Sequence, residues 1–340
     1  MEKTLLCGLD LKEIRAFTGR FGGNDQHSLK LANSIYKKGT LYYSGVKDIP
    51  KKLIASLEEN SSPGVFIPHL TEKSADGTVK YLFISPSGSK FETVYIPDKK
   101  RHTVCVSSQA GCRMGCKICA TGRYGFHGNL TAGEIVNQVI SIPAGGKITH
   151  VVFMGMGEPM DNIENVLKAT EILTAEWGRA LSPKNITVST VGITPSVKRF
   201  LDETYCNLTI SLFTPFFEER AEFLPVENKY PVEEIIPVIK TEDIRKKRRL
   251  TFSYVMIRGL NDSDRHISGL RSLLSGSGIR INLIPYHRIP GDEHVASSPD
   301  RMQFFKHNLV ISGISASIRR SRGTDISAAC GLLASKMIDH

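Results

Sequence analysis

The sequence predicts an α/β protein in which a partial (βα)6 barrel follows a small helical module and a β-hairpin. From about residue 102 onward, β-rich runs alternate with helical stretches, and repeated βα units favour a parallel sheet with helices outside. Before that point, helical periodicity gives way to two β-rich runs around a turn. These patterns divide the chain into a helical module at 1–62, a hairpin extension at 63–100 and a barrel core at 101–335.

The chain begins with segments of helical periodicity. Apolar side chains recur at helix-like spacing within 9–17 and again within 29–36. A glycine-rich break at 22–25 separates the two segments. A third helix, over about 49–57, is expected to start at the signal provided by Pro50. Three short helices therefore make up the predicted helical module.

Residues 65–97 change in character. Within each of the runs Val79–Ile84 and Phe91–Ile96, side chains alternate in character, and both runs are rich in β-branched and aromatic residues. Between them, Pro86–Ser89 has the composition of a turn. Two such runs around a turn predict a β-hairpin just ahead of the barrel.

The barrel is predicted from an alternation of strands and helices. Candidate strands cover 102–107, 149–154, 186–191, 207–212, 250–257 and 279–285, with a last strand at 314–319. Candidate helices cover 131–142, 161–176, 194–203, 231–241, 262–275 and 299–312. In barrels of this type, chemistry collects at the carboxyl ends of the strands, so residues that follow each strand are the candidates for a site.

Composition places the chain among ordinary globular proteins, with 340 residues, 41% hydrophobic and 23% charged. The amino terminus lacks a signal-peptide pattern and no apolar run reaches membrane length, so we expect a cytoplasmic protein without a membrane partner. A net charge of +10 predicts a polyanionic partner, most simply nucleic acid. A solvated basic surface without such a partner is the alternative.

Seven cysteines, an odd number in a reducing compartment, argue against a disulfide framework. Cys112, Cys116 and Cys119 form a C-x3-C-x2-C motif just after the first barrel strand. Thiolates favour zinc or iron–sulfur clusters. Three of them can hold three irons of a 4Fe-4S cluster and leave one iron open to the amino and carboxylate groups of S-adenosylmethionine (SAM). This spacing and position resemble the radical-SAM superfamily.

A structural zinc site is the competing interpretation of the three cysteines. Such sites usually need four ligands, often as two C-x2-C-like pairs. No second pair follows in the sequence, although His102, Cys105 or His127 could supply a fourth ligand. The zinc interpretation therefore stays open at this stage.

The second strand ends in a glycine-rich turn that includes Gly157, Glu158 and Pro159. Glycine lets a ligand approach the backbone closely, so exposed carbonyls there could accept hydrogen bonds from the SAM ammonium. Polar residues at other strand ends are further candidates for SAM contacts. They are Ser189, Ser211 with its neighbours Leu212 and Phe213, Asn282 and His287. A turn-forming role is the alternative for each of these polar residues.

Two more cysteines complete a longer pattern. Cys105 stands seven residues before the cysteine motif, and the segment Arg322–Gly331 contains Asp-Ile-Ser-Ala-Ala-Cys-Gly, which ends with Cys330 and Gly331. Together with the cysteine motif and the Gly-Glu-Pro turn, these segments resemble the RlmN/Cfr family of radical-SAM RNA methyltransferases over about residues 80–335. The resemblance implies a partial radical-SAM barrel with an N-terminal accessory domain that binds RNA.

The resemblance also implies a mechanism that uses two SAM molecules per turnover. Cys330 would take a methyl group from the first SAM. A 5′-deoxyadenosyl radical from the second would then abstract hydrogen from that methyl, and the carbon radical would add to adenine. Cys105 would release the product by forming a transient disulfide with Cys330. Glu92 matches the position of the base in that release, although both thiols could instead be inert core groups and Glu92 an ordinary strand residue.

Two positions depart from the family pattern. The segment after the fourth strand usually reads Ser-Leu-His, and here Phe213 stands in place of the histidine. His287 replaces an asparagine that contacts SAM in the family. Phenylalanine cannot form a hydrogen bond, whereas histidine still can, so only the first change removes a polar side chain.

Three basic clusters are candidates for contact with RNA phosphates, namely Lys99–Arg101, Arg245–Arg249, and Arg319 and Arg320 with Arg322. The resemblance implies adenosine C2 methylation in 23S rRNA and in tRNA, because the Gly-Glu-Pro turn is similar to that of the C2 branch. The alternatives are C8 methylation of the Cfr type and a zinc-stabilised RNA-binding protein without catalysis. The family resemblance further implies a monomer that accepts electrons from a donor such as flavodoxin or ferredoxin.

Overall fold

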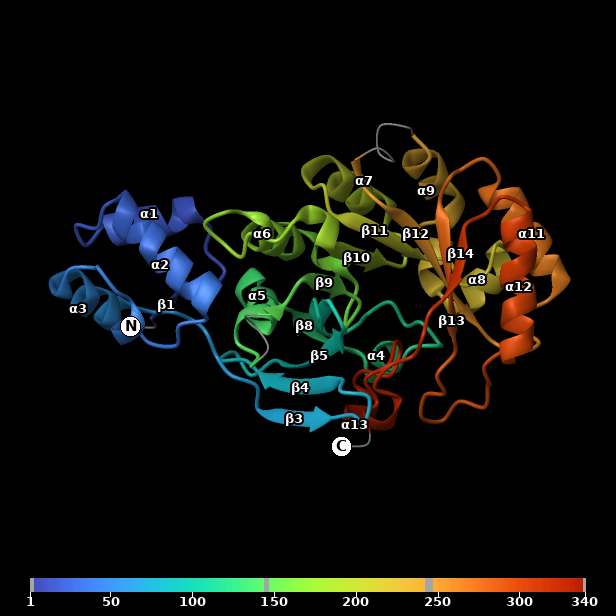
Figure 1. Cartoon of the computed structure of the whole chain (residues 1–340), viewed down its shortest axis with the longest axis horizontal. Helices are drawn as coiled ribbons and strands as arrows, with labels where there is room; N and C mark the ends of the chain where they lie inside the picture. The colour runs from blue at the N-terminus through green and yellow to red at the C-terminus, as the bar shows by residue number, and fades with distance from the viewer. Residues whose placement is uncertain (1–2, 144–146, 242–246, 339–340) are drawn as a thin grey trace.

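A ten-stranded mixed sheet runs through the part of the chain that is described, residues 3–143, 147–241 and 247–338 of a computed structural model (Figure 1). The strand order is β14-β13-β12-β11-β10-β9-β6-β5-β4-β3. From β6 to β14 every neighbouring pair is parallel. These strands are β6 (Arg101–Val106), β9 (His150–Phe153), β10 (Ile186–Thr190), β11 (Asn207–Ser211), β12 (Leu250–Met256), β13 (Arg280–Pro285) and β14 (Ala316–Ile318).

Helices connect these strands and cover the outside of the curved sheet (Figure 1). They are α5 (Ala132–Ile140), α6 (Ile163–Thr174), α7 (Thr194–Glu203), α9 (Val232–Ile239), α11 (Asp264–Leu274) and α12 (Pro299–Ile311). Each predicted strand and helix of the barrel matches an observed element within two residues at either end. The prediction of a partial α/β barrel is therefore confirmed.

Several short elements near the barrel mouth lack a sequence prediction. The helices α4 (Ala120–Tyr124), α8 (Phe217–Phe223) and α13 (Ser335–Ile338) each have fewer than eight residues, too few for a periodic pattern to stand out. The pair β7 (Gln109–Gly111) and β8 (Phe126–Asn129) encloses the cysteine motif. These elements matter because they shape the loops around the strand ends.

The predicted hairpin joins the barrel sheet directly. β4 (Val79–Ile84) pairs antiparallel with β5 (Lys90–Asp98), and β3 (Leu70–Lys73) adds an edge strand. β5 then pairs antiparallel with β6, with Val94 opposite Cys105. The hairpin thus extends the barrel sheet and brings its residues beside the strand that precedes the cysteine motif.

The amino-terminal helices α1 (Leu11–Gly19), α2 (Asp25–Lys38) and α3 (Lys51–Asn60) form a group at one end of the molecule (Figure 1). A two-stranded pair, β1 (Thr4–Leu5) with β2 (Ser61–Ser62), closes this group. The Tyr36 hydroxyl on α2 donates a hydrogen bond to the Leu9 carbonyl, just before α1, at 2.5 Å. This bond links α2 to the start of α1. No helix within the described ranges is long and apolar enough to cross a bilayer.

The helical group contacts the barrel through backbone atoms, at a point where both residues are glycine. Gly8 and Gly133 on α5 lie so close that a Cβ on Gly133 would fall 2.3 Å from the Cys7 carbonyl oxygen. A real Cβ cannot approach an oxygen that closely, so glycine at Gly133 is a condition for this contact.

We therefore expect Gly133→Ala to separate the helical group from α5 and to lower the free energy of unfolding by about 1–3 kcal/mol, as overpacking does elsewhere. Thermal unfolding and limited proteolysis measure the effect. Gly19→Ala is the matched control, because a Cβ there meets nothing within 4 Å. An unchanged melting temperature for Gly133→Ala would contradict the close contact.

Candidate active site

A pocket opens at the carboxyl ends of the parallel strands. The predicted site residues that line it are Cys112, Cys116, Cys119, Gly157, Glu158, Ser189, Ser211, Asn282, His287 and Cys330. They come from five of the strands or the loops after them and from the carboxyl-terminal segment, which are far apart in sequence. The fold therefore brings most of the predicted site together. Cys105, Glu92, Leu212 and Phe213 lie outside the pocket lining.

Backbone hydrogen bonds hold the cysteine loop at the pocket wall. The Cys112 amide donates to the Gly125 carbonyl at 2.8 Å, across the base of the loop. The Lys117 amide, between Cys116 and Cys119, donates to the Phe223 carbonyl on α8 at 2.9 Å. These bonds fix the loop so that all three thiols face one pocket.

The donor set fits an iron–sulfur cluster better than a single metal ion. Within the described residues, no three His, Cys, Asp or Glu side chains converge as ligands of one ion. In a 4Fe-4S cluster each thiolate binds a different iron, so the sulfurs need not converge. Burial raises the pKa of the Cys116 thiol, and coordination by iron would reverse this effect by deprotonating it.

None of the three possible fourth zinc ligands joins the cysteines. His102 shares a 2.6 Å hydrogen bond with the Tyr95 hydroxyl, and the His127 ring packs against Tyr124 at 4.4 Å. Cys105 is buried within β6. His102, Cys105 and His127 are all absent from the lining of the pocket, so the geometry disfavours the zinc interpretation.

The Gly-Glu-Pro turn is fixed by Gly157 and by the Glu158 carboxylate. Gly157 has φ +95°, and a Cβ there would lie 2.5 Å from the Gln109 Cβ, so only glycine fits. The buried Glu158 carboxylate accepts 2.9 Å hydrogen bonds from the amides of Met160 and Val191. Burial raises the pKa of Glu158 to about 7. A cationic ligand beside it would offset that cost of burial and favour the charged form.

Polar side chains of the later strands face the same pocket. The Ser211 and Ser253 hydroxyls are 3.5 Å apart, and Asn282 accepts a 2.7 Å hydrogen bond from Ser317. His287 Nε2 lies 3.1 Å from the Ser321 hydroxyl. Burial lowers the pKa of His287, so the ring is neutral near pH 7 and can offer one donor and one acceptor.

Leu212 and Phe213 point away from the pocket, into the core. Phe213 is 2% exposed, and its ring packs on Phe223 at 5.0 Å. Its backbone has φ +66°, a left-handed conformation that costs energy in a residue other than glycine. The departure from the family histidine therefore changes a core contact and takes no polar group from the pocket lining.

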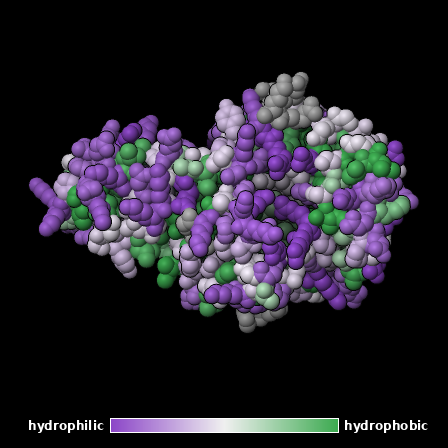
Figure 2. All heavy atoms as spheres, in the orientation of Figure 1, coloured by the Kyte–Doolittle hydropathy of each residue, from purple (hydrophilic) through white to green (hydrophobic). Residues whose placement is uncertain are grey.

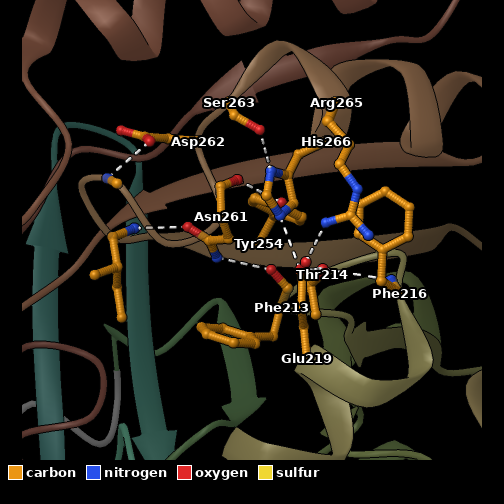
Figure 3. Close-up of polar contacts among 12 residues, drawn as sticks. Phe213, Thr214, Phe216, Glu219, Tyr254, Asn261, Asp262, Ser263, Arg265 and His266 are labelled. Carbon is orange, nitrogen blue, oxygen red and sulfur yellow. Dashed lines mark hydrogen bonds and ion pairs between the residues drawn. The ribbon is translucent and has the colours of Figure 1, made fainter.

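A polar network behind the fourth strand holds Phe213 in place (Figure 3). Asn261 Nδ2 donates to the Phe213 carbonyl at 2.8 Å, and the Tyr254 hydroxyl donates to the Asn261 carbonyl at 2.7 Å. Beside it, Glu219 lies 2.7 Å from the Thr214 hydroxyl and 2.9 Å from His266 Nε2. The sequence did not predict this network, because the contacts of Asn261 with Phe213 and of His266 with Glu219 join different βα units and no local pattern marks them.

A second missed residue links two loops of the site. Arg123 on α4 donates to the Lys117 carbonyl at 3.0 Å and pairs with Asp292 at 2.9 Å. The Asp292 carboxylate also accepts a 2.9 Å hydrogen bond from the Tyr286 hydroxyl. Arg123 thus joins the cysteine loop to the segment after β13 that carries His287.

Cys330 lines the pocket, and Cys105 lies behind the lining, near enough for the two thiols to interact electrostatically. Water reaches Cys330, which lies in an open pocket although protein atoms surround it on most sides. Burial, and after it the nearby Cys330, raise the pKa of the Cys105 thiol to about 12. Both are free thiols in this structure. The proximity of one accessible and one buried thiol is the arrangement that a transient disulfide needs.

Glu92 lies beneath the loop that carries Cys330. Its buried carboxylate pairs with Lys80 at 3.0 Å and accepts a 2.8 Å hydrogen bond from the Ala334 amide. Lys80 also pairs with Glu72 at 3.0 Å. In this state Glu92 holds the carboxyl-terminal segment, and its predicted role as a base stays a prediction.

The other end of the Cys330 loop is tied to the turn between β3 and β4. Asp325 accepts hydrogen bonds from the Ser74 hydroxyl at 2.6 Å and from the Ala75 amide at 3.1 Å. The Asp76 carboxylate accepts a 3.0 Å hydrogen bond from the Gly323 amide. With Glu92 at its far end, the loop is therefore anchored to the hairpin on both sides of Cys330.

A basic pocket adjoins the first one and shares Cys330, His287 and Arg319 with it. Its cationic lining is Arg101, Arg319, Arg320 and Arg322. Two of the three predicted basic clusters thus meet beside Cys330. Figure 2 shows hydrophilic side chains crowding this face of the molecule.

The remaining basic cluster falls partly outside the described residues, at Arg245 and Lys246. Within the part that is described, Arg248 is 6% exposed and donates to the carbonyls of Leu201 and Thr204 at 2.6 Å. A buried arginine with carbonyl partners stabilises the fold locally, so this side chain does not face an RNA.

Comparisons with known proteins agree with the site. The sequence pattern of the Radical SAM superfamily matches residues 106–268. A solved radical SAM methyltransferase from Sphaerobacter thermophilus superposes with a TM-score of 0.92 at 36% identity, covering 98% of this chain and 99% of that chain. Fold and site together define a radical SAM protein, whose cofactors are a 4Fe-4S cluster and SAM.

Curated relatives narrow the class further. Proteins named probable dual-specificity RNA methyltransferase RlmN from Parabacteroides distasonis and Bacteroides thetaiotaomicron are each 43% identical, over 98% of this chain and 97% and 96% of theirs. Dual-specificity RNA methyltransferase RlmN from Syntrophotalea carbinolica is 37% identical over 98% of this chain and 90% of its own. The chain belongs to the RlmN family.

Replacement of one cluster ligand tests the site directly. We expect Cys116→Ala to lose most of the iron and sulfide, and the broad visible absorbance, of the anaerobically purified protein, because only two thiolates remain. Cys206→Ala is the matched control, since Cys206 is buried away from the pocket and should leave iron content unchanged. A colourless wild-type protein that contains one zinc would contradict the cluster.

Proposed function

We propose that the protein is a radical SAM RNA methyltransferase that methylates carbon 2 of adenosine in 23S rRNA and in tRNA. The observation that carries the proposal is the position of Cys330. This accessible thiol lines the same pocket as the three cluster cysteines and lies beside the buried thiol of Cys105. In this proposal one pocket holds the groups for radical formation and methyl transfer, and the thiol for product release lies behind its lining.

The chemistry of the substrate explains this combination. Carbon 2 of adenine is not nucleophilic, so it cannot take a methyl group from SAM by direct displacement. The Cys330 sulfur can, and it leaves S-adenosylhomocysteine behind. A 4Fe-4S cluster held by Cys112, Cys116 and Cys119 would supply the one-electron reduction of a second SAM, with electrons from a low-potential donor of the flavodoxin or ferredoxin class, and so give methionine and a 5′-deoxyadenosyl radical. Cys330 then holds its methyl group within reach of that radical and of the adenine.

Release of the product requires a second thiol. Attack of the Cys105 sulfur on the Cys330 sulfur forms an S–S bond and breaks the bond between Cys330 and the transferred carbon. The unpaired electron of the adduct would return to the cluster, and the proton on carbon 2 would leave to a base, for which we propose Glu92. The carbon freed from Cys330 would take up a proton and become the new methyl group. Its pairing with Lys80 must open for that step. A cellular dithiol would return Cys105 and Cys330 to their reduced forms.

We further propose that the basic pocket beside Cys330 holds the RNA backbone. Phosphate contacts by arginine position an RNA without reading its sequence. The target adenosine must leave its stack to reach the neighbouring pocket, as in other enzymes that modify bases. The names of the relatives, which describe dual-specificity RNA methyltransferases, support two kinds of RNA substrate. A monomer in the cytoplasm is the form in which we propose that it acts.

The choice of carbon 2 is supported by the Gly157, Glu158 and Pro159 turn, which is similar to the C2 branch of the family. Methylation of carbon 8 is the alternative activity. The two differ in the modified nucleoside and share the same thiols.

The thiol roles lead to a mass-spectrometric test. A peptide containing Cys330 from SAM-treated protein should carry one methyl group. Cys105→Ala should lose multiple turnover and accumulate protein covalently attached to RNA, because the adduct cannot resolve. Cys206→Ala should turn over like the wild type. Normal turnover by Cys105→Ala would overturn the assignment of the resolving thiol.

The basic pocket leads to a binding test. We expect Arg319→Gln to weaken RNA binding about equally for all sequences and to reduce the slope of log affinity against log salt by about 1, as for the loss of one phosphate contact. Arg199→Gln is the control, because Arg199 pairs with Glu164 on α6, outside this pocket. An unchanged salt slope for Arg319→Gln would contradict the proposed phosphate contact.

A further inference from the structure

A fully buried arginine lies behind the wall of the SAM pocket. Arg220 on α8 is 0% exposed, and its guanidinium donates to three carbonyl oxygens at the ends of β10 and β11. The distances are 2.9 Å to Leu212, 2.6 Å to Val191 and 2.9 Å to Ser211. Val191 and Ser211 line the pocket together with the cysteines, so Arg220 holds two strand ends that shape it.

Arg220 has a buried carboxylate as its counter-ion. Its Nη1 forms an ion pair with Glu227, which is 1% exposed. Glu227 also accepts hydrogen bonds from the Val232 amide, at 3.0 and 3.1 Å to its two oxygens. Replacement of this pair by apolar groups would have avoided the cost of burying two charges. Packing alone therefore does not explain why a charge lies here.

The same helix touches the cysteine loop. The Phe223 carbonyl at the end of α8 accepts the Lys117 amide at 2.9 Å, one residue from Cys116. Arg220 lies one turn before Phe223 on α8, and it holds the carbonyls of Val191 and Ser211, which line the same pocket as Cys116. Helix α8 thus holds the positive charge of Arg220 near the loop of Cys116, a proposed cluster ligand. The counter-ion, Glu227, is bound to the Val232 amide.

We propose that the Arg220–Glu227 pair sets the reduction potential of the cluster, and that Arg220 also positions the strand ends against which SAM binds. The inference rests on the proposed cluster at Cys112, Cys116 and Cys119. Reduction adds one electron from the low-potential donor to a cluster that is already surrounded by thiolates. A nearby cation favours the reduced state and a nearby carboxylate disfavours it, and the effect is strong where water is excluded.

The two charges predict shifts of opposite sign. Arg220→Gln leaves the Glu227 carboxylate uncompensated, so the midpoint potential should fall. Glu227→Gln keeps the size and acceptor oxygen of the side chain and leaves the arginine uncompensated, so the potential should rise. The double variant should return toward the wild type. A merely structural role would not produce opposite shifts that cancel.

The Arg220→Lys variant distinguishes the effect of the positive charge from the effect of the three hydrogen bonds to the strand ends. Lysine keeps the positive charge but cannot reach three carbonyls in the planar arrangement of a guanidinium. We expect a potential near that of the wild type and a loss of SAM affinity of at least tenfold. If Arg220→Gln fails to fold, Glu227→Gln and Arg220→Lys still decide the proposal.

The experiment is an anaerobic redox titration of the reconstituted full-length protein without SAM, followed by electron paramagnetic resonance of the reduced cluster. Iron content and melting temperature are measured for every variant, and Arg199→Gln serves as the exposed control with an unchanged potential. Equal potentials in all variants, or shifts of the same sign in Arg220→Gln and Glu227→Gln, would overturn the proposal. A wild-type protein without a cluster would overturn the proposed function as well, which distinguishes the two failures.

Discussion

The site depends on the two different pairings of strand β6. On one side β6 pairs parallel with β9, and on the other it pairs antiparallel with β5 from the hairpin. Parallel pairing places the end of β6, where the cysteine loop begins, beside the end of β9, where the Gly-Glu-Pro turn begins. Antiparallel pairing brings β5 alongside with Glu92, whose carbonyl accepts a 2.5 Å hydrogen bond from Ser107. Cys105 lies on β6 itself, between these two partners.

The hairpin connects this centre to the far end of the chain. The segment around Cys330 has little regular structure of its own, with left-handed backbone at Ser327 and Ala334. Polar contacts to the hairpin hold it at both ends, through Asp76 and through Glu92. The role proposed for Cys330, which would meet a radical, a base and a second thiol in turn, would need a loop that is held in place but not packed into the core. Anchors at the two ends leave Cys330 itself accessible.

Much of the fold could be predicted because each barrel element carries its own local pattern. Val188 and Ile210 lie in strands in which apolar residues alternate with polar ones, and both side chains are buried. The spacing of Cys112, Cys116 and Cys119 predicted a metal centre, and the family resemblance pointed to Cys330; all four line one pocket. The direction of the Phe213 side chain could not be predicted, since it depends on an amide from Asn261 in a later unit. The partners of Glu92 and Arg220 are likewise set by tertiary contacts, which no local pattern reveals.

The central claim is that this pocket methylates carbon 2 of adenosine in RNA. Mass spectrometry of nucleosides from purified 23S rRNA and tRNA of a strain without this gene tests it most directly. The account predicts that 2-methyladenosine disappears from both RNAs and returns with the wild-type gene but not with Cys330→Ala. Persistence of 2-methyladenosine in the deletion strain, or the loss of 8-methyladenosine in its place, would contradict it.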